Sequence, residues 1–254
     1  MRRPILAAAT SLLLCLSASG QGASQDHRAD CAQDDDLDRS IASCTIILNN
    51  VNENARDRAE AYLNRGLAWH DKQKRIRALA DYSEALGLDP TLATGYYRRG
   101  QVWRKEGDVD RAIADYTQAV VLEPHNATFR NERCWALAIA DRDLEIALAD
   151  CNESLRLEPN DANTLDSRGF VYLRLGRLAE AVDDYDAALK INPDDAQSLF
   201  GRGIAKLRRG DTASADADLA AAKAIRPSIA DKFFGYGIYL PLIITTTASK
   251  MPAE

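Results

Sequence analysis

Five of the eight prolines in this 254-residue chain recur at an almost fixed interval. They are separated by 34, 35, 34 and 34 residues, at Pro90, Pro124, Pro159, Pro193 and Pro227. A fixed period near 34 residues is typical of a stack of small units, each packed only against its neighbours. The spacing therefore excludes a barrel or a doubly wound enzyme built on one large core.

Two helices are predicted between successive prolines. Apolar residues recur at helical spacing in two blocks per unit, with Gly107, Gly176 or Gly210 between the blocks and with Asp108 or Asp211 next, as a turn followed by a helix N-cap residue. Proline ends the second helix. A single hairpin of this kind cannot bury its apolar face, so stability comes from stacking. The pattern predicts an all-α fold of antiparallel helix pairs.

Aligned on the prolines, the units resemble the tetratricopeptide repeat. The second unit reads ATGYYRRGQVWRKEGDVDRAIADYTQAVVLEP. The positions that carry the resemblance are Tyr62, Gly66, Trp69, Ala78, Tyr82, Ala85 and Pro90 in the first unit, Tyr96, Gly100, Trp103, Ala112, Tyr116, Ala119 and Pro124 in the second, Leu165, Gly169, Tyr172, Ala181, Tyr185, Ala188 and Pro193 in the fourth, and Leu199, Gly203, Ala215, Leu219, Ala222 and Pro227 in the fifth. The resemblance implies a right-handed superhelical solenoid with five repeats over residues 59–227 and a concave inner face.

The first 24 residues are expected to be a secretory signal rather than part of the fold. Two arginines precede an apolar run at residues 5–16, and small and polar residues follow it. The alternative is a membrane anchor, but the run is shorter than the roughly 20 apolar residues of a spanning helix. We therefore expect an exported protein of bacterial type, periplasmic or secreted. Its basic residues are dispersed among the acidic ones, which argues against nucleic-acid binding.

The ends of the mature chain are expected to cap the stack. Residues 25–58 contain RSIASCTIIL, which resembles the second helix of a unit, and are interpreted as an N-terminal half-repeat. Residues 228–238 are expected to form a capping helix that covers the last repeat with Ile229, Phe233 and Phe234. Residues 239–254 form an apolar tail that Pro241 interrupts, so we expect no stable membrane span. A flexible tail or docking segment and an attachment to a membrane or partner both remain open.

The third unit has cysteines where other units have glycine in the first helix and tyrosine or leucine in the second. These are Cys134 and Cys151, and the unit has one extra residue in its turn. Since the two positions should face each other across the hairpin, an exported protein is expected to form a disulfide there. Four mature cysteines allow three connectivities, and the local one also joins Cys31 to Cys44. Buried free thiols are the alternative; the histidines lack zinc spacing, so no metal or cofactor is expected.

Each unit also repeats one basic and one acidic residue. Arginine precedes the glycine position and aspartate precedes the aromatic residue of the second helix, at Arg65, Arg99, Arg133, Arg168 and Arg202 and at Asp81, Asp115, Asp150, Asp184 and Asp218. One interpretation is a row of arginines that binds an anionic partner. The interpretation we favour is a structural ladder of ion pairs that clamps successive helices, because the acid repeats as faithfully as the base.

In tetratricopeptide proteins, positions on the first helix of each repeat line the concave groove. Carried onto this chain, the candidate protein-binding residues are Tyr97, Gln101, Arg104, Asn131, Trp135, Asn163, Asp166, Phe170 and Phe200. The aromatic members are the residue types that tend to dominate binding energy at interfaces. Alternatively, several of them fill the inside of the curve.

The sequence favours a non-enzymatic module that binds peptides or protein partners of unknown identity, as an exported adaptor or assembly factor. It contains no glycine-rich phosphate loop, nucleophile motif or zinc motif, so an enzyme is the weaker interpretation. The alternative is a structural spacer or oligomerisation subunit of an envelope complex, and a homo-oligomer remains open.

Overall fold

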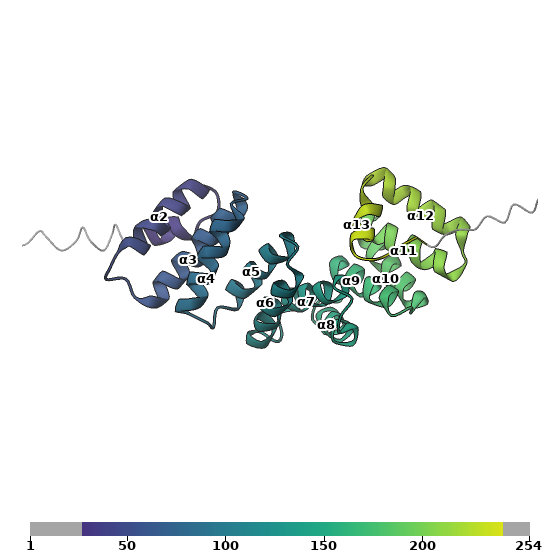
Figure 1. Cartoon of the computed structure of the whole chain (residues 1–254), viewed down its shortest axis with the longest axis horizontal. Helices are drawn as coiled ribbons and strands as arrows, with labels where there is room; N and C mark the ends of the chain where they lie inside the picture. Colours follow the sequence, from purple (N-terminus) through teal and green to yellow (C-terminus); the bar gives the residue numbers. More distant parts are fainter. Residues whose placement is uncertain (1–26, 241–254) are drawn as a thin grey trace, which may run out of the picture. The chain divides into compact units, whose positions relative to one another are not determined.

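The computed structural model describes residues 27–240, and every regular element among them is a helix (Figure 1). The predicted all-α class is confirmed. The described residues divide into two compact units between Val102 and Trp103, so the boundary falls within α5 (Ala93–Lys105).

The first unit contains a short helical stretch at residues 27–32, then α2 (Leu37–Asn49), α3 (Ala55–Asp71), α4 (Arg75–Leu88) and the beginning of α5. α2 packs on α3 and α3 packs on α4. Asn54 accepts a hydrogen bond from the backbone N–H of Asp57, which is the usual way in which an asparagine caps a helix. Because of this cap, the first helix of the first repeat begins at residue 55, before the expected boundary at 59.

The second unit continues the series of hairpins. Its helices are α6 (Val109–Leu122), α7 (Ala127–Ile139), α8 (Leu144–Leu157), α9 (Ala162–Arg174), α10 (Leu178–Ile191), α11 (Ala196–Arg209), α12 (Thr212–Ile225) and α13 (Ile229–Gly235). The pairs α7 and α8, α9 and α10, and α11 and α12 form the hairpins. In addition α9 contacts both α7 and α11, so these three first helices form one continuous face.

The turns inside the hairpins require left-handed backbone. Gly176 and Gly210 have φ of 73° and 91°, which glycine adopts without a steric penalty. The third repeat has no glycine there, and its longer turn instead places Asp141 and Asp143 at φ of 53° and 46°. The extra residue detected in the proline spacing is therefore accommodated by two left-handed aspartates, a residue type that tolerates this region better than most.

Close approach between the two helices of a hairpin depends on glycine opposite tyrosine. A Cβ built on Gly66 would lie 2.7 Å from the ring of Tyr82, and the Tyr82 side chain is fully buried. Between hairpins, a Cβ on Gly201 would lie 2.4 Å from the ring of Tyr185. These positions leave no room for a larger residue, because protein interiors are close-packed.

Candidate functional site

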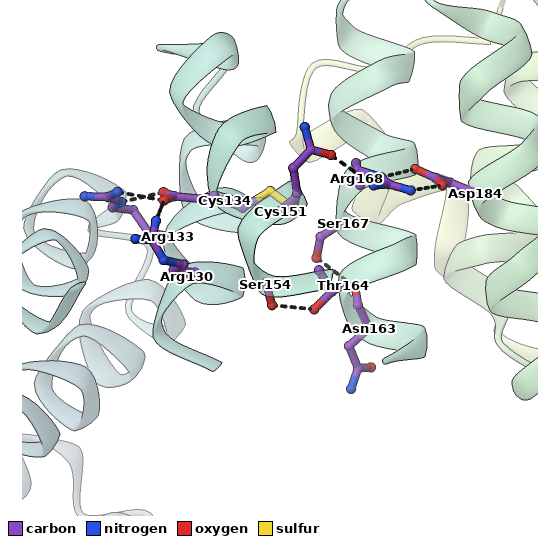
Figure 2. The surroundings of a disulfide bond; sticks show 12 residues. Arg130, Arg133, Cys134, Cys151, Ser154, Asn163, Thr164, Ser167, Arg168 and Asp184 are labelled. Carbon is purple, nitrogen blue, oxygen red and sulfur yellow. Dashed lines mark hydrogen bonds and ion pairs between the residues drawn. A yellow bond between two sulfur atoms is a disulfide. The ribbon is translucent and has the colours of Figure 1, made fainter. Parts of the chain in front are cut away.

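Two disulfide bonds join the cysteines in the local pattern. Cys134 of α7 is bonded to Cys151 of α8, with Cα atoms 5.7 Å apart, at the place where other hairpins pack glycine against tyrosine (Figure 2). Cys31 is bonded to Cys44 of α2 in the first unit. Within residues 27–240 no cluster of histidine, cysteine and acidic residues could hold a metal ion.

Four of the repeated arginines donate two hydrogen bonds each to the aspartate of the same hairpin. The donor–acceptor distances lie between 2.5 and 2.8 Å, in the pairs Arg65 with Asp81, Arg133 with Asp150, Arg168 with Asp184 and Arg202 with Asp218. Bidentate pairs of this kind are the strong, geometrically specific form of an ion pair. The two remaining members, Arg99 and Asp115, belong to different units.

Two of these guanidinium groups also reach the preceding hairpin. Nη1 of Arg168 donates to Asn152 of α8 at 2.9 Å, and Nη1 of Arg202 donates to Asp186 of α10 at 2.6 Å (Figure 2 shows the first site). Each of these arginines therefore connects its own second helix to the second helix of the preceding repeat. The N–H groups of these two arginines therefore donate to acceptors within the chain rather than to an outside anion.

The face formed by α7, α9 and α11 is covered by the chain's own helix α13. We call Trp135, Phe170 and Phe200, one residue from each helix, the aromatic face; their exposed fractions are 8%, 1% and 1%. The ring of Phe233 in α13 lies 4.8 Å from that of Phe200 and 5.7 Å from that of Phe170. Tyr236, the next residue after α13, lies 5.6 Å from Trp135. Three of the four aromatic residues expected to line an open groove, Trp135, Phe170 and Phe200, are thus buried beneath α13 and Tyr236.

α13 covers the last repeat as expected, but not with all three of the expected side chains. Ile229 and Phe233 are fully buried, as predicted, but Phe234 is 63% exposed and contacts Tyr239 instead. The helix also ends at Gly235, before the expected boundary at 238. Adjacent residues on a helix face different directions, whereas residues four places apart share a face, so the register of α13 against the aromatic face decides which phenylalanine is buried.

One arginine holds the end of α13 in place. Nη2 of Arg174, at the end of α9, donates to the carbonyl oxygen of Tyr236, and Nη1 lies 3.3 Å from a carboxylate oxygen of Asp141. The guanidinium stacks on Phe170 at 5.4 Å. Burial lowers the pKa of Arg174, and its Nε has no hydrogen-bond partner.

A second polar contact involves Lys232 of α13. Its ammonium donates to the side-chain oxygen of Gln197, and the Gln197 amide donates to the Asp166 carboxylate at 2.5 Å. Ser198 donates to the other Asp166 oxygen at 2.8 Å. Burial, assisted by the charge of Asp195, raises the pKa of Asp166 to about 6. Asp166, a candidate groove residue, thus belongs to a buried network that reaches α13.

Beside this network lies a cavity of 170 Å³. Polar side chains from α9, α11 and the segment around α13 form most of its lining, including Asn163, Asp166, Asp195, Arg226 and Lys232. Asn163, another candidate groove residue, lies at this opening and is exposed.

The remaining candidate groove residues lie on α5 and α7. Tyr97 and Gln101, in the first unit, are half-buried, and the Gln101 amide donates to the Tyr97 hydroxyl at 2.7 Å. In the second unit, Nε of Arg104 lies 3.5 Å from a carboxylate oxygen of Glu132, next to the half-buried Asn131. None of these four residues belongs to the buried aromatic cluster under α13.

Sequence reasoning did not identify Arg174, Lys232 and Tyr236 as part of this site. A signal was present for α13 itself, because Ile229, Phe233 and Tyr236 follow the i, i+4, i+7 spacing of one helix face. The spacing indicates that a face is buried but does not indicate against which surface.

Family models for the tetratricopeptide repeat match residues 93–126 and 135–200. The chain is a tetratricopeptide repeat protein. Because this repeat is a scaffold for protein interaction, the chain is a protein-interaction module. A search of curated proteins gives no match.

Similar solved structures share the fold at low identity. They include YrrB, described as a TPR protein with an unusual peptide-binding site, at 22% identity, with 77% of this chain and 98% of that chain covered and a TM-score of 0.60. A tetratricopeptide repeat protein from Parabacteroides merdae is 17% identical, with coverages of 84% and 88% and a TM-score of 0.67. PilW, described as a type IV pilus biogenesis factor, is 17% identical, with coverages of 66% and 77% and a TM-score of 0.60.

The helices described for residues 27–240 include none with the length and apolarity needed to cross a membrane. The expected signal at residues 1–24 and most of the tail at residues 239–254 lie outside the described residues.

Proposed function

We propose that this tetratricopeptide repeat protein is an exported, non-enzymatic adaptor or assembly factor that holds a segment of a partner protein on the face formed by its first helices. The observation that carries the proposal is the position of α13. Rings from three successive repeats, Trp135, Phe170 and Phe200, contact Phe233 of this short helix or Tyr236 directly after it. The face is therefore shaped to receive a helical segment.

Side chains around the aromatic face also suit recognition of a protein segment. Arg174 donates to a backbone carbonyl, a group that every polypeptide presents. Gln197 accepts from a lysine, a side chain that a partner segment can also supply. Aromatic anchors surrounded by a few polar groups are typical of protein-binding surfaces.

Export is supported by the two disulfides. Such bonds persist in oxidising compartments and are rare in the cytosol. The printed descriptions of YrrB and PilW, which concern peptide binding and pilus biogenesis, are compatible with a peptide-binding or assembly role for this chain.

The proposal is tested by site-specific photo-cross-linking in the native compartment. A photoreactive residue at Asn163, at the opening beside Lys232, is compared with one at Gln118, an exposed residue of α6. We expect a discrete partner to be cross-linked from position 163 and not from position 118, as identified by mass spectrometry. Equal products from both positions, or cross-links only to other copies of this chain, would overturn the adaptor model; the second result would favour the spacer.

A further inference from the structure

We propose that α13 is a replaceable occupant of the aromatic face, and that the partner competes for this face with an amphipathic helix that carries the same pattern: an aliphatic residue, then lysine, phenylalanine and tyrosine at i+3, i+4 and i+7. The inference rests on the proposed function and names the class of partner segment. It also implies that α13 covers the binding face in the protein without its partner.

The pattern is read from the side chains that α13 presents. Ile229 and Phe233 lie on one side of the helix, and Tyr236, directly after its end, contacts Trp135 of the same face, while Asp231 and Phe234 are exposed on the other side. Recognition of an amphipathic helix through anchors at i, i+4 and i+7 is a recurring mode of peptide binding.

The receptor surface contains polar groups that fix the register of its occupant. Gln197 accepts from the Lys232 ammonium, the Asp166 carboxylate lies behind Gln197, and Arg174 donates to the carbonyl of Tyr236. A cap that only shielded apolar surface would not require a buried carboxylate and a buried guanidinium. These groups instead select a helix with a basic residue one position before its first aromatic anchor.

Occupancy by α13 depends on the aromatic face. The helix has only seven residues, and helices this short are not stable by themselves in water. It is joined to α12 by residues 226–228 alone, so a short hinge could release it. The 170 Å³ cavity beside Lys232 adjoins α13 and offers space for a partner segment longer than this helix.

A short tether gives α13 a high effective concentration at the face, so the wild-type chain should bind an added copy of this helix weakly. The probe is a fluorescent peptide with the sequence of residues 226–240, RPSIADKFFGYGIYL. It is titrated, by anisotropy, into the oxidised protein. The test variant, Phe233→Ala with Tyr236→Ala, weakens the internal helix, and the matched control is Phe234→Ala, the same change at the adjacent exposed position.

We expect the peptide to bind the Phe233→Ala, Tyr236→Ala chain about tenfold or more tightly than the wild type, because the fraction of open receptor increases. The Phe234→Ala chain should behave like the wild type. A peptide in which the residues equivalent to Phe233 and Tyr236 are alanine should bind none of the proteins.

A second test variant avoids any cavity among the rings. Lys232→Ala removes from α13 the ammonium that donates to Gln197 and leaves the receptor groups intact, so it should also increase binding of the peptide, which keeps its lysine. Circular dichroism reports whether each variant keeps its helices. If the peptide binds neither opened variant, or binds Phe234→Ala equally well, α13 is a permanent cap and the inference is overturned. A partner still cross-linked through Asn163 in that case would leave the proposed function standing.

Discussion

At the scale of single residues, burial is decided by which neighbours the fold supplies. Phe233 and Phe234 are adjacent and chemically identical, yet one has no exposed surface and the other is 63% exposed. Asp166 illustrates the same point for a charged group. It is a surface-type residue in the sequence, but α9 and α11 enclose it with Gln197 and Ser198.

The raised pKa of Asp166 predicts a pH-dependent stability. Since its pKa in the folded chain is about 6 rather than 3.8, the folded state binds this proton more tightly than the unfolded state. The contribution of Asp166 is therefore fully favourable below about pH 4 and is lost as the pH rises through 6. Asp166→Asn cannot ionise, so it should gain up to about 3 kcal/mol of unfolding free energy relative to wild type between pH 4 and pH 7.5.

The measurement is urea denaturation of both proteins at the two pH values. Asp183→Asn, at an exposed position of α10, is the control and should show little change. The same difference from wild type at both pH values for Asp166→Asn would contradict the prediction.

At the scale of helices, the repeated arginine and aspartate act as connections between elements. Asp150 accepts from both Arg130 and Arg133, and its side chain is only 2% exposed. The carboxylate thereby joins α8 to two successive turns of α7. The hairpin that contains this pair is also the one joined by the disulfide.

Removal of the Asp150 charge should destabilise the chain. Asp150→Asn leaves two largely buried guanidinium groups without their counter-charge, which should lower the unfolding free energy by about 3 kcal/mol. The matched control is Glu60→Gln, which removes the acid of the exposed pair with Arg56 at 3.3 Å and should change stability by less than about 0.5 kcal/mol. Urea denaturation measures both; equal effects of the two changes would show that burial does not control the strength of the pair.

At the scale of the whole molecule, the described part of each compact unit contains a disulfide. Cys31–Cys44 lies in the first unit and Cys134–Cys151 in the second. Each bond closes a short loop within its unit, and bonds of this loop length stabilise folded proteins by about 3 kcal/mol.

This arrangement predicts the thiol content of the chain. Residues 25–254, unfolded in guanidinium without reductant, should react with no thiol reagent, and after reduction they should expose four thiols. The control is the Cys134→Ala, Cys151→Ala chain, which should give no thiol before reduction and two after it. Two or more reactive thiols before reduction of the wild type would contradict the two-bond scheme.

Much of the fold could be predicted because local and periodic patterns in the sequence determine it. Proline spacing gave the repeat length, and the extra residue before Pro159 located the altered turn that the structure forms at Asp141 and Asp143. The replacement of glycine and tyrosine by Cys134 and Cys151 predicted a pair that the hairpin brings into contact. In each case the interacting residues are fewer than about 20 positions apart, so the repeat itself fixes their geometry.

The candidate site could not be predicted in the same way, because its contacts do not recur with the repeat period of the sequence. The sequence by itself determined the hairpins, their turns and the position of each first-helix residue within its repeat. Only the tertiary structure decided that α13 covers Trp135, Phe170 and Phe200, and that Arg174 and Gln197 hold it there. The physical reason is that a terminal helix outside the repeat pattern has no neighbour of its own kind to pack against, so its place is chosen by the complementarity of surfaces that form only after the repeats have stacked.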